Sequence, residues 1–281
     1  MMSKTLFISD LDGTLLDDSA ELSEYTTSSL KAKISGGLHF TVATARTFAT
    51  ASIILSKLEL KLPVILMNGV LIYDPRQKFY LQINALIPET VATIIQTLKN
   101  FNITGFMYTL GNNELATYYE SLEQKPLRDF LDERVTKYGK TFTFTEDFQL
   151  VSPDNVIYFT LLDTHERLLP VYNEFTLRSD LGITFYKDNY SPDLWYLEIF
   201  SNKASKKNAI DYLRKEYGYE YIIGFGDNLN DLPMFAACDV RVAVENAKDE
   251  VRKAADHICA ANIDDGVVKW LESYSTDIRL Q

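Results

Sequence analysis

Cysteine is nearly absent from this sequence. Its 281 residues include two cysteines, Cys238 and Cys259, and these are not spaced as metal ligands or as a redox pair. A scaffold of several disulfides, on which many small secreted domains depend, is therefore excluded. We expect both thiols to be reduced core residues of a cytoplasmic protein.

Basic charge is also scarce. The chain has 28 Lys and Arg against 39 Asp and Glu, a formal net charge of -11. Nucleic-acid binding needs a basic face that displaces counterions, so we expect no nucleic-acid partner. An anionic substrate stays compatible with this balance, because a metal ion and a few basic side chains can reverse the field inside one cleft.

Long apolar runs are missing as well. No stretch approaches the ~18 continuous apolar residues of a membrane span. The apolar run near the N-terminus is too short for a signal peptide and is interrupted by an acidic residue. We therefore expect a protein that does not associate with membranes.

What the sequence does contain is an alternation of strand and helix patterns near both ends. Hydrophobic residues make up 46% and charged residues 24% of the chain, as in ordinary globular proteins. Strands that alternate with helices indicate a parallel sheet with helices on both faces, so we predict an α/β fold. The predicted strands are apolar runs that end in turn residues, at 4–10, 38–46, 63–74 and 221–231.

The middle of the chain has a different pattern. Residues 103–119 predict a hairpin with "GNNE" as its turn, and the later runs 155–164, 183–189 and 194–200 alternate in polarity. Such alternation favours an antiparallel sheet with one buried face. We predict an inserted α+β domain at 84–190, flanked by two halves of the α/β domain at 1–83 and 191–281.

Two aspartates stand at the end of the first predicted strand, in "LFISDLDGTLLDD". Asp10 and Asp12 are two residues apart and so point to the same side, where their charges repel unless a cation is present. A divalent cation would resolve this for one carboxylate, while the other could keep a proton for acid–base chemistry. An Asp-Gly turn is the simpler alternative. A calcium loop is disfavoured because Leu15 replaces its glycine and a strand precedes it.

A second polar cluster, "GFGDNLND", follows the predicted strand at 221–231. It offers Asp227, Asn230 and Asp231. A dinucleotide-binding loop is excluded because Leu229 replaces the third glycine and Asp227 would repel a pyrophosphate. In open α/β sheets, sites form at the carboxyl ends of strands, so this cluster indicates an acidic metal pocket near Asp10.

Two further residues are candidates for binding an anion. Thr44 ends the second predicted strand, although a single threonine there is more often a helix cap. Lys206 begins a predicted helix, where a positive charge opposes the macrodipole, and a solvated surface lysine is its simpler interpretation. Lys203 and Lys207 lie close by in sequence and compete for the same role.

Taken together, these elements resemble the haloacid dehalogenase (HAD) superfamily of phosphohydrolases, and the resemblance spans nearly the whole chain. "DLDGT" is similar to its first motif, Thr44 in "ATAR" to its second, Lys206 in "SKK" to its third and "GDNLND" to its fourth. The long insert resembles the α/β cap of subclass IIB, Cof-type members. The resemblance thus implies a Rossmann-like parallel-sheet core with an inserted α+β cap.

The resemblance also implies a mechanism. Asp10 would attack phosphorus and become an aspartyl phosphate, while Asp12 would protonate the leaving alcohol and then activate water. The implied cofactor is Mg²⁺, held by the Asp10 carboxylate, the Asp12 main-chain carbonyl and Asp227, with Asp231 steering bound waters. Such oxygen ligands suit Mg²⁺.

The remaining roles concern the substrate. The resemblance implies that Thr44, Lys206 and Asn230 hold the phosphoryl oxygens, and that Arg46 and Asn68 contact the substrate. This chain departs from the family pattern at two positions: Ala45 stands where family members usually have Gly, and Lys207 stands where they often have Gly. Neither change removes a catalytic group, but both alter the rim of the site.

The expected function is hydrolysis of small phosphorylated metabolites, with sugar phosphates as the first choice. A sugar phosphomutase of the same superfamily is the alternative enzyme. A non-catalytic binding or regulatory protein is the alternative from another class, and Asp12 beside Asp10 argues against it. The sequence does not indicate the oligomeric state.

Overall fold

The computed structural model describes residues 4–188 and 193–274. The chain divides into two compact units, which are described separately. The core unit comprises the residues up to Leu81 and those from Ser205 onward, and the insert comprises Gln82–Ala204. Within the described ranges, no helix has both the length and the apolar character that a membrane crossing requires.

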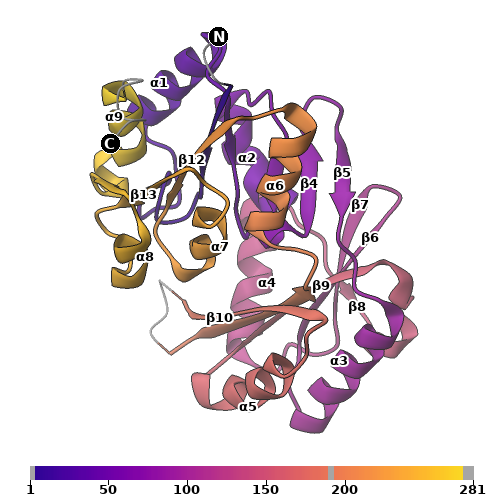
Figure 1. Ribbon diagram of the computed structural model, residues 1–281. Coiled ribbons are helices and arrows are strands. Elements are labelled where there is room, and N and C mark those ends of the chain that lie inside the picture. The colour runs from indigo at the N-terminus through magenta and orange to yellow at the C-terminus, as the bar shows by residue number, and fades with distance from the viewer. Residues whose placement is uncertain (1–3, 189–192, 275–281) are drawn as a thin grey trace. The chain divides into compact units, whose positions relative to one another are not determined.

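The core unit contains a five-stranded parallel sheet in the order β14-β13-β12-β1-β2 (Figure 1). A bridge between Ala43 and Ile65 brings β3 beside β2, and β3 also begins a small sheet in the order β3-β4-β5, whose last strand runs past the division at Gln82. The elements are β1 (Thr5–Ser9), α1 (Glu24–Ser35), β2 (Phe40–Val42), α2 (Phe48–Leu58), β3 (Val64–Leu66), β4 (Leu71–Asp74), β5 (Phe79–Ile83), α6 (Lys206–Tyr217), β12 (Tyr221–Gly226), α7 (Leu232–Phe235), β13 (Val240–Val244), α8 (Asp249–Ala254), β14 (His257–Cys259) and α9 (Gly266–Ser273).

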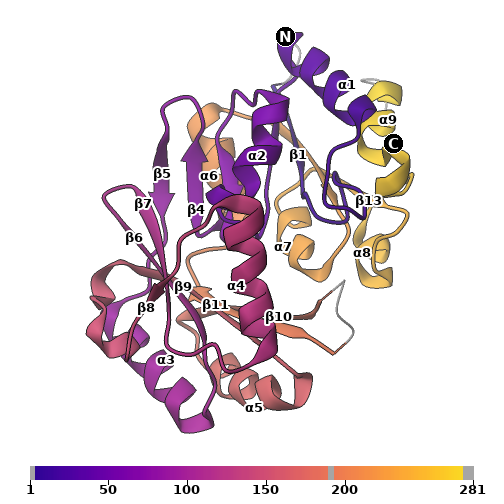
Figure 2. The same ribbon diagram turned by 180° about the vertical axis from the view of Figure 1, so that it is seen from behind.

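Helices cover both faces of this sheet, which confirms the predicted α/β architecture. Helix α1 packs against α2 and α9, whereas α7 packs against α6 and α8. Figures 1 and 2 show α2 and α6 on opposite sides of the strands. The middle of the sheet is accordingly shielded from solvent, and β1 is buried at every position after Thr5.

The insert is built around a six-stranded sheet in the order β10-β11-β9-β6-β7-β8. All pairings are antiparallel except that of β7 with β8. Its elements are α3 (Pro88–Phe101), β6 (Gly105–Gly111), β7 (Glu114–Tyr119), α4 (Lys125–Tyr138), β8 (Thr143–Phe144), β9 (Val156–Asp163), α5 (His165–Thr176), β10 (Leu181–Lys187) and β11 (Trp195–Ser201).

The prediction of a one-faced sheet is wrong for the centre of the insert. Apolar residues of α3 and α5 form a core with one face of the sheet. On the other face, Phe130 of α4 stacks on Phe106 and contacts Tyr196. Because both faces are covered, every residue of β9 is buried.

The insert also ends later than predicted. The predicted limit at 190 falls outside the described residues, but β11 pairs with both β9 and β10. This strand therefore belongs to the insert, and the chain returns to the core unit at Ser205. The predicted start at 84 lies two residues beyond the observed division at Gln82.

Candidate active site

The candidate site lies where β1 and β12 end side by side in the core unit. Ser9 pairs with Phe225, and the Asp10 N–H donates to the Phe225 carbonyl at 3.0 Å. Asp10 and Asp227 thus follow two neighbouring parallel strands at their carboxyl ends. Because parallel strands have their carboxyl ends at the same edge of a sheet, the sequence alone predicts that Asp10 and Asp227 lie close together.

A buried lysine joins the two predicted clusters. The Lys206 Nζ atom lies 2.7 Å from Asp10 Oδ1 and 2.7 Å from Asp231 Oδ1. Lys206 is 1% exposed, so the interpretation as a solvated surface lysine is wrong. Burial disfavours its ammonium, but the Asp10 and Asp231 carboxylates outweigh that penalty and raise its pKa.

Three carboxylates converge closely enough to share one cation. Each of Asp10, Asp227 and Asp231 offers an oxygen, and these oxygens lie within 4.8 Å of one another. Burial, which is only partly countered by Lys206, raises the pKa of Asp10 well above its usual range. Burial, followed by repulsion from Asp231, raises the pKa of Asp227 to about 7. These hard oxygen donors with excess negative charge fit a divalent cation such as Mg²⁺.

Asp231 already uses both of its carboxylate oxygens. Oδ1 accepts from Lys206, and Oδ2 accepts from the main-chain N–H groups of Asp227 at 2.9 Å and Asn228 at 3.0 Å. It therefore shapes the loop after β12 and fixes Lys206. That arrangement is compatible with the predicted indirect role of Asp231 at the metal.

Two glycines allow the carboxylates to come this close. Gly13 has φ +76°, and a Cβ atom there would lie 2.5 Å from Asp227 Oδ2. A Cβ atom on Gly226 would lie 2.7 Å from the Asp231 Cβ. Thr14 adds a hydrogen bond, with Oγ1 donating to Asp227 Oδ1 at 2.8 Å. None of these three residues was predicted as part of the site, although Gly13 and Thr14 belong to the "DLDGT" motif.

The Asp12 side chain is turned toward Arg46 and is not one of the three converging carboxylates. The Arg46 Nε atom donates to Asp12 Oδ2 at 2.7 Å, and Nη2 donates to Oδ1 at 2.5 Å. Such a two-pronged guanidinium pair is among the stronger polar contacts in proteins. The Asp12 main-chain carbonyl as a metal ligand and Arg46 as a substrate contact both remain predictions.

The other predicted residues lie on three loops: Thr44 follows β2, Asn68 follows β3 and Asn230 follows β12. The buried Thr44 accepts the Asn68 N–H on its carbonyl at 3.0 Å and the Arg46 N–H on Oγ1 at 3.1 Å. The Asn230 amide reaches Asn68 Oδ1 over a long 3.4 Å. Helix α2 is capped by Thr47 rather than Thr44, so the capping interpretation of Thr44 is wrong.

Comparison with known proteins identifies the chain. Residues 7–271 match the family model described as haloacid dehalogenase-like hydrolase. The chain belongs to this family. Among its relatives is 5-amino-6-(5-phospho-D-ribitylamino)uracil phosphatase YitU of Bacillus subtilis, 23% identical over 94% of this chain and 95% of that protein. Another is pyridoxal phosphate phosphatase YbhA of Escherichia coli, 25% identical over 97% of this chain and 99% of that protein.

A solved structure confirms the family's fold in this chain. The HAD subclass IIB sugar phosphatase BT4131 superposes with a TM-score of 0.74 at 21% identity, covering 96% of this chain and 98% of that one. The family match and the phosphatase relatives make the chain a HAD-like phosphatase of the Cof type.

Proposed function

We propose that this phosphatase hydrolyses small phosphorylated metabolites, sugar phosphates first among them, with Mg²⁺ and through an aspartyl-phosphate intermediate on Asp10. The buried cluster of Asp10, Lys206, Asp227 and Asp231 carries the proposal. Burying three carboxylates around one lysine costs stability. A functional requirement explains why the protein has this cluster in spite of that cost. The phosphorylated small molecules in the names of YitU and YbhA, and the sugar phosphatase BT4131, support the substrate class.

Asp10 is the proposed nucleophile because its position is fixed from two directions. Its main chain is bonded to β12, and Lys206 holds Oδ1 at 2.7 Å. A carboxylate held in this way loses little orientational freedom when it attacks phosphorus. The attack forms an O–P bond to Asp10 and breaks the bond to the leaving alcohol.

Asp12 is the proposed acid and base. It would give a proton to the leaving alkoxide and later take one from the water that hydrolyses the aspartyl phosphate. Both of its oxygens contact Arg46, so this work requires the guanidinium to move away from at least one of them. A phosphoryl group is itself a ligand that guanidinium groups bind well, which gives Arg46 an alternative partner.

The metal would be held by the carboxylates of Asp10 and Asp227 and by the Asp12 main-chain carbonyl. When bound, Mg²⁺ would neutralise charge on the phosphoryl oxygens. Thr44, Asn230 and Lys206 are proposed to bind those oxygens. The hydrogen bond from Thr14 holds Asp227 for this purpose.

The test is a phosphate-release screen over sugar phosphates, nucleotides, pyridoxal phosphate and flavin mononucleotide, after chelation and after Mg²⁺ is restored. We expect turnover only with the metal, and inorganic phosphate as the product. An isomerised sugar phosphate would indicate the mutase instead. Asp10→Asn should lower kcat by about 10⁴-fold or more, as loss of a nucleophile does. Asp18→Asn, in the exposed loop that follows, is the control, and unchanged turnover in Asp10→Asn refutes the nucleophile.

A further inference from the structure

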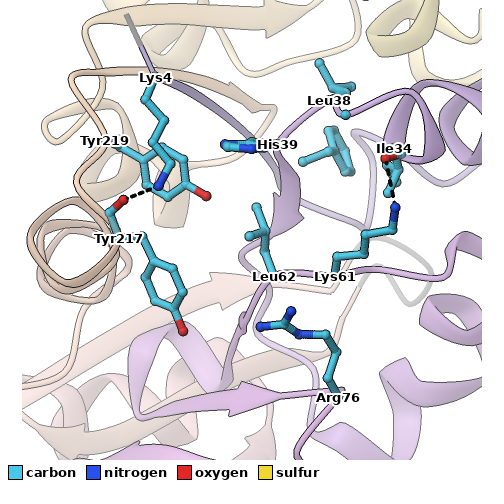
Figure 3. A pocket seen from close by; sticks show the side chains of 11 residues that line it. Lys4, Ile34, Leu38, His39, Lys61, Leu62, Arg76, Tyr217 and Tyr219 are labelled. Carbon is cyan, nitrogen blue, oxygen red and sulfur yellow. Dashed lines mark hydrogen bonds between the residues drawn. The ribbon is translucent and has the colours of Figure 1, made fainter.

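The two edges of the core sheet differ in how their loops are connected. At the amino ends of β1, β2 and β12, side chains surround a hollow of about 270 Å³ (Figure 3). At the carboxyl ends, hydrogen bonds join the loop after β1 to the loops after β12, β13 and β14. Two asparagines that the proposed mechanism does not use, Asn246 after β13 and Asn262 after β14, hold that first loop.

Asn246 bonds the residue that directly follows Asp12. Its Nδ2 atom donates to the Gly13 carbonyl at 2.8 Å, and its Oδ1 atom accepts the Asn262 N–H at 3.0 Å. These main-chain partners fix which way the amide faces, because an N–H can only donate and a carbonyl can only accept. The Asn246 side chain is therefore held in one orientation, even though the residue is exposed.

Asn262 holds the far end of the same turn. It is 8% exposed, and its Nδ2 atom donates to the Leu16 carbonyl at 2.9 Å. Within the turn, the N–H groups of residues 14–16 all donate to the Leu11 carbonyl, at 2.9–3.2 Å. None of those three bonds uses the carbonyl of Gly13 or Leu16, so the two asparagines supply contacts that the internal bonds of the turn do not.

The bond to Gly13 matters for Asp12 because glycine has the widest conformational freedom of any residue. Gly13 has φ +76°, in the left-handed region, and it has no side chain that could restrict its rotation. When its carbonyl is fixed, the peptide between Asp12 and Gly13 has less freedom to rotate. That restriction applies both to the Asp12 main-chain carbonyl and to the direction of the Asp12 side chain.

The loop after β13 also reaches the other half of the catalytic centre. Two residues after Asn246, the Lys248 N–H donates to the Asp227 carbonyl at 2.9 Å. The Asp227 side chain in turn accepts Thr14 Oγ1 at 2.8 Å. The segment 246–248 therefore contacts Gly13 on one side of the centre and Asp227 on the other, which sets these two loops relative to each other.

We propose that Asn246 is a positioning residue for Asp12. By holding the Gly13 carbonyl, it keeps the Asp12 carboxyl aimed at the oxygen of the leaving alcohol. In that step an Asp10 oxygen bonds to phosphorus, the bond from phosphorus to the alcohol oxygen breaks, and the Asp12 proton passes to that oxygen. This role rests on the proposed function, in which Asp12 is the general acid.

The test compares two esters that differ in their need for a proton. The alkoxide of glucose phosphate leaves poorly unless it is protonated, whereas the phenolate of dinitrophenyl phosphate leaves without a proton. The quantity compared is kcat/KM of the full chain at saturating Mg²⁺, which covers the steps up to the aspartyl phosphate. Asn246→Asp removes the donor to Gly13 and keeps the acceptor for Asn262, while Asn246→Ala removes both without adding charge.

Both variants should lower kcat/KM for glucose phosphate by about 10- to 100-fold, because a misplacement of about 1 Å can cost that much. For dinitrophenyl phosphate, which does not need the acid, the loss should be less than about threefold. Asn202→Ala is the matched control. The Asn202 Nδ2 atom also donates to a main-chain carbonyl, that of Ser179 in the insert at 2.7 Å, and its loss should leave both values unchanged.

Equal losses with the two esters would show general damage to the site and overturn the proposal, as would full activity of both Asn246 variants. Failure of the proposed function gives a different pattern, which Asp12→Asn reveals. This variant should show the same dependence on the leaving group in a stronger form. If Asp12→Asn loses neither ester or both alike, Asp12 is not the general acid, and the role given to Asn246 falls with it.

Discussion

Lys206 combines three properties that rarely occur in one lysine. It is the first residue of α6, it is 1% exposed, and it contacts two carboxylates that are themselves buried. The helix macrodipole and burial both disfavour the charge at this position. The Asp10 and Asp231 carboxylates compensate for both effects, so the three side chains depend on one another.

The first prediction concerns that dependence. Lys206→Met leaves two buried carboxylates without a cation, so the free energy of unfolding of the metal-free protein should fall by about 3–5 kcal/mol. Mg²⁺ should recover part of the loss, because a divalent cation can replace the missing charge. Urea unfolding with EDTA and with Mg²⁺ measures both effects.

Lys207→Met is the control for this experiment. Lys207 is the next residue, is about half exposed and pairs with Asp211 one turn along α6. Exposed pairs of this kind contribute less than about 1 kcal/mol. Equal losses in the two variants would contradict the role given to the Lys206 cluster.

A second residue-scale prediction comes from Lys140 in the insert. Its ammonium lies 4.4 Å from the ring centroid of Tyr108 and 4.9 Å from that of Phe142. Burial, and secondly Arg134, lowers the pKa of Lys140 to about 7. In the unfolded chain the group keeps its proton up to about pH 10. Stability should therefore rise with pH from about 7 to about 10, since only the unfolded state still binds the proton there.

Lys140→Met should abolish this rise. We expect the variant to be more stable than the unchanged protein at pH 7, by up to a few kcal/mol, and the difference to shrink at pH 9.5. Urea unfolding at the two pH values measures it. A difference independent of pH would show that Lys140 does not lose its proton in this range.

At the scale of elements, the strands that hold the site were the most predictable part of the molecule. β1 and β12 are short apolar runs that end in acidic residues, and parallel pairing brings such ends together. Asp10 and Asp227 could therefore be placed close together from the sequence alone, whereas Lys206, at the start of α6, was indicated only by its resemblance to the third family motif.

Other elements have weaker patterns in the sequence than β1 and β12. Helix α4 buries only Leu127 and Phe130 among its fourteen residues, too few to show a helical period. Because helix α4 was not predicted, the sheet of the insert was expected to have only one buried face. The pairing of Asp12 with Arg46 was also not predictable, because it depends on how two loops from different strands approach each other.

The glycine at the end of β12 supports a prediction at this scale. In Gly226→Ala, the new methyl group would collide with Asp231, whose carboxylate holds Lys206. We expect about 1–3 kcal/mol less stability, as for other overpacked sites, together with a clear loss of kcat. Gly111→Ala is the control, because the nearest atom to its Cβ would be 3.7 Å away. Full activity in Gly226→Ala would contradict the tight packing behind Asp231.

At the scale of the whole molecule, the chain has one tryptophan in each compact unit. Trp195 packs against Phe185 in the insert, and Trp270 contacts Phe225 in the core unit. These are the only two tryptophans of the sequence. Each unit can therefore be followed separately by fluorescence.

If the two units unfold independently, a defect in one should leave the other unchanged. Gly226→Ala should move the urea midpoint reported by Trp270, in a Trp195→Phe background, to lower concentration. The midpoint reported by Trp195, in a Trp270→Phe background, should stay in place. Equal shifts of both midpoints would show that the whole chain unfolds as one cooperative unit.

The separation along the chain of residues that meet at the site has a consequence during synthesis. Lys206 lies 196 residues after Asp10, and Asp227 lies 213 residues after Thr14. At about 5–20 residues per second, the ribosome needs roughly 10–40 s after it has made β1 to reach Lys206 and Asp227. Throughout that time the nascent β1 lacks its neighbour β12, while the contiguous insert can fold. A prematurely terminated chain would thus carry Asp10 and Asp12 and still have no catalytic centre.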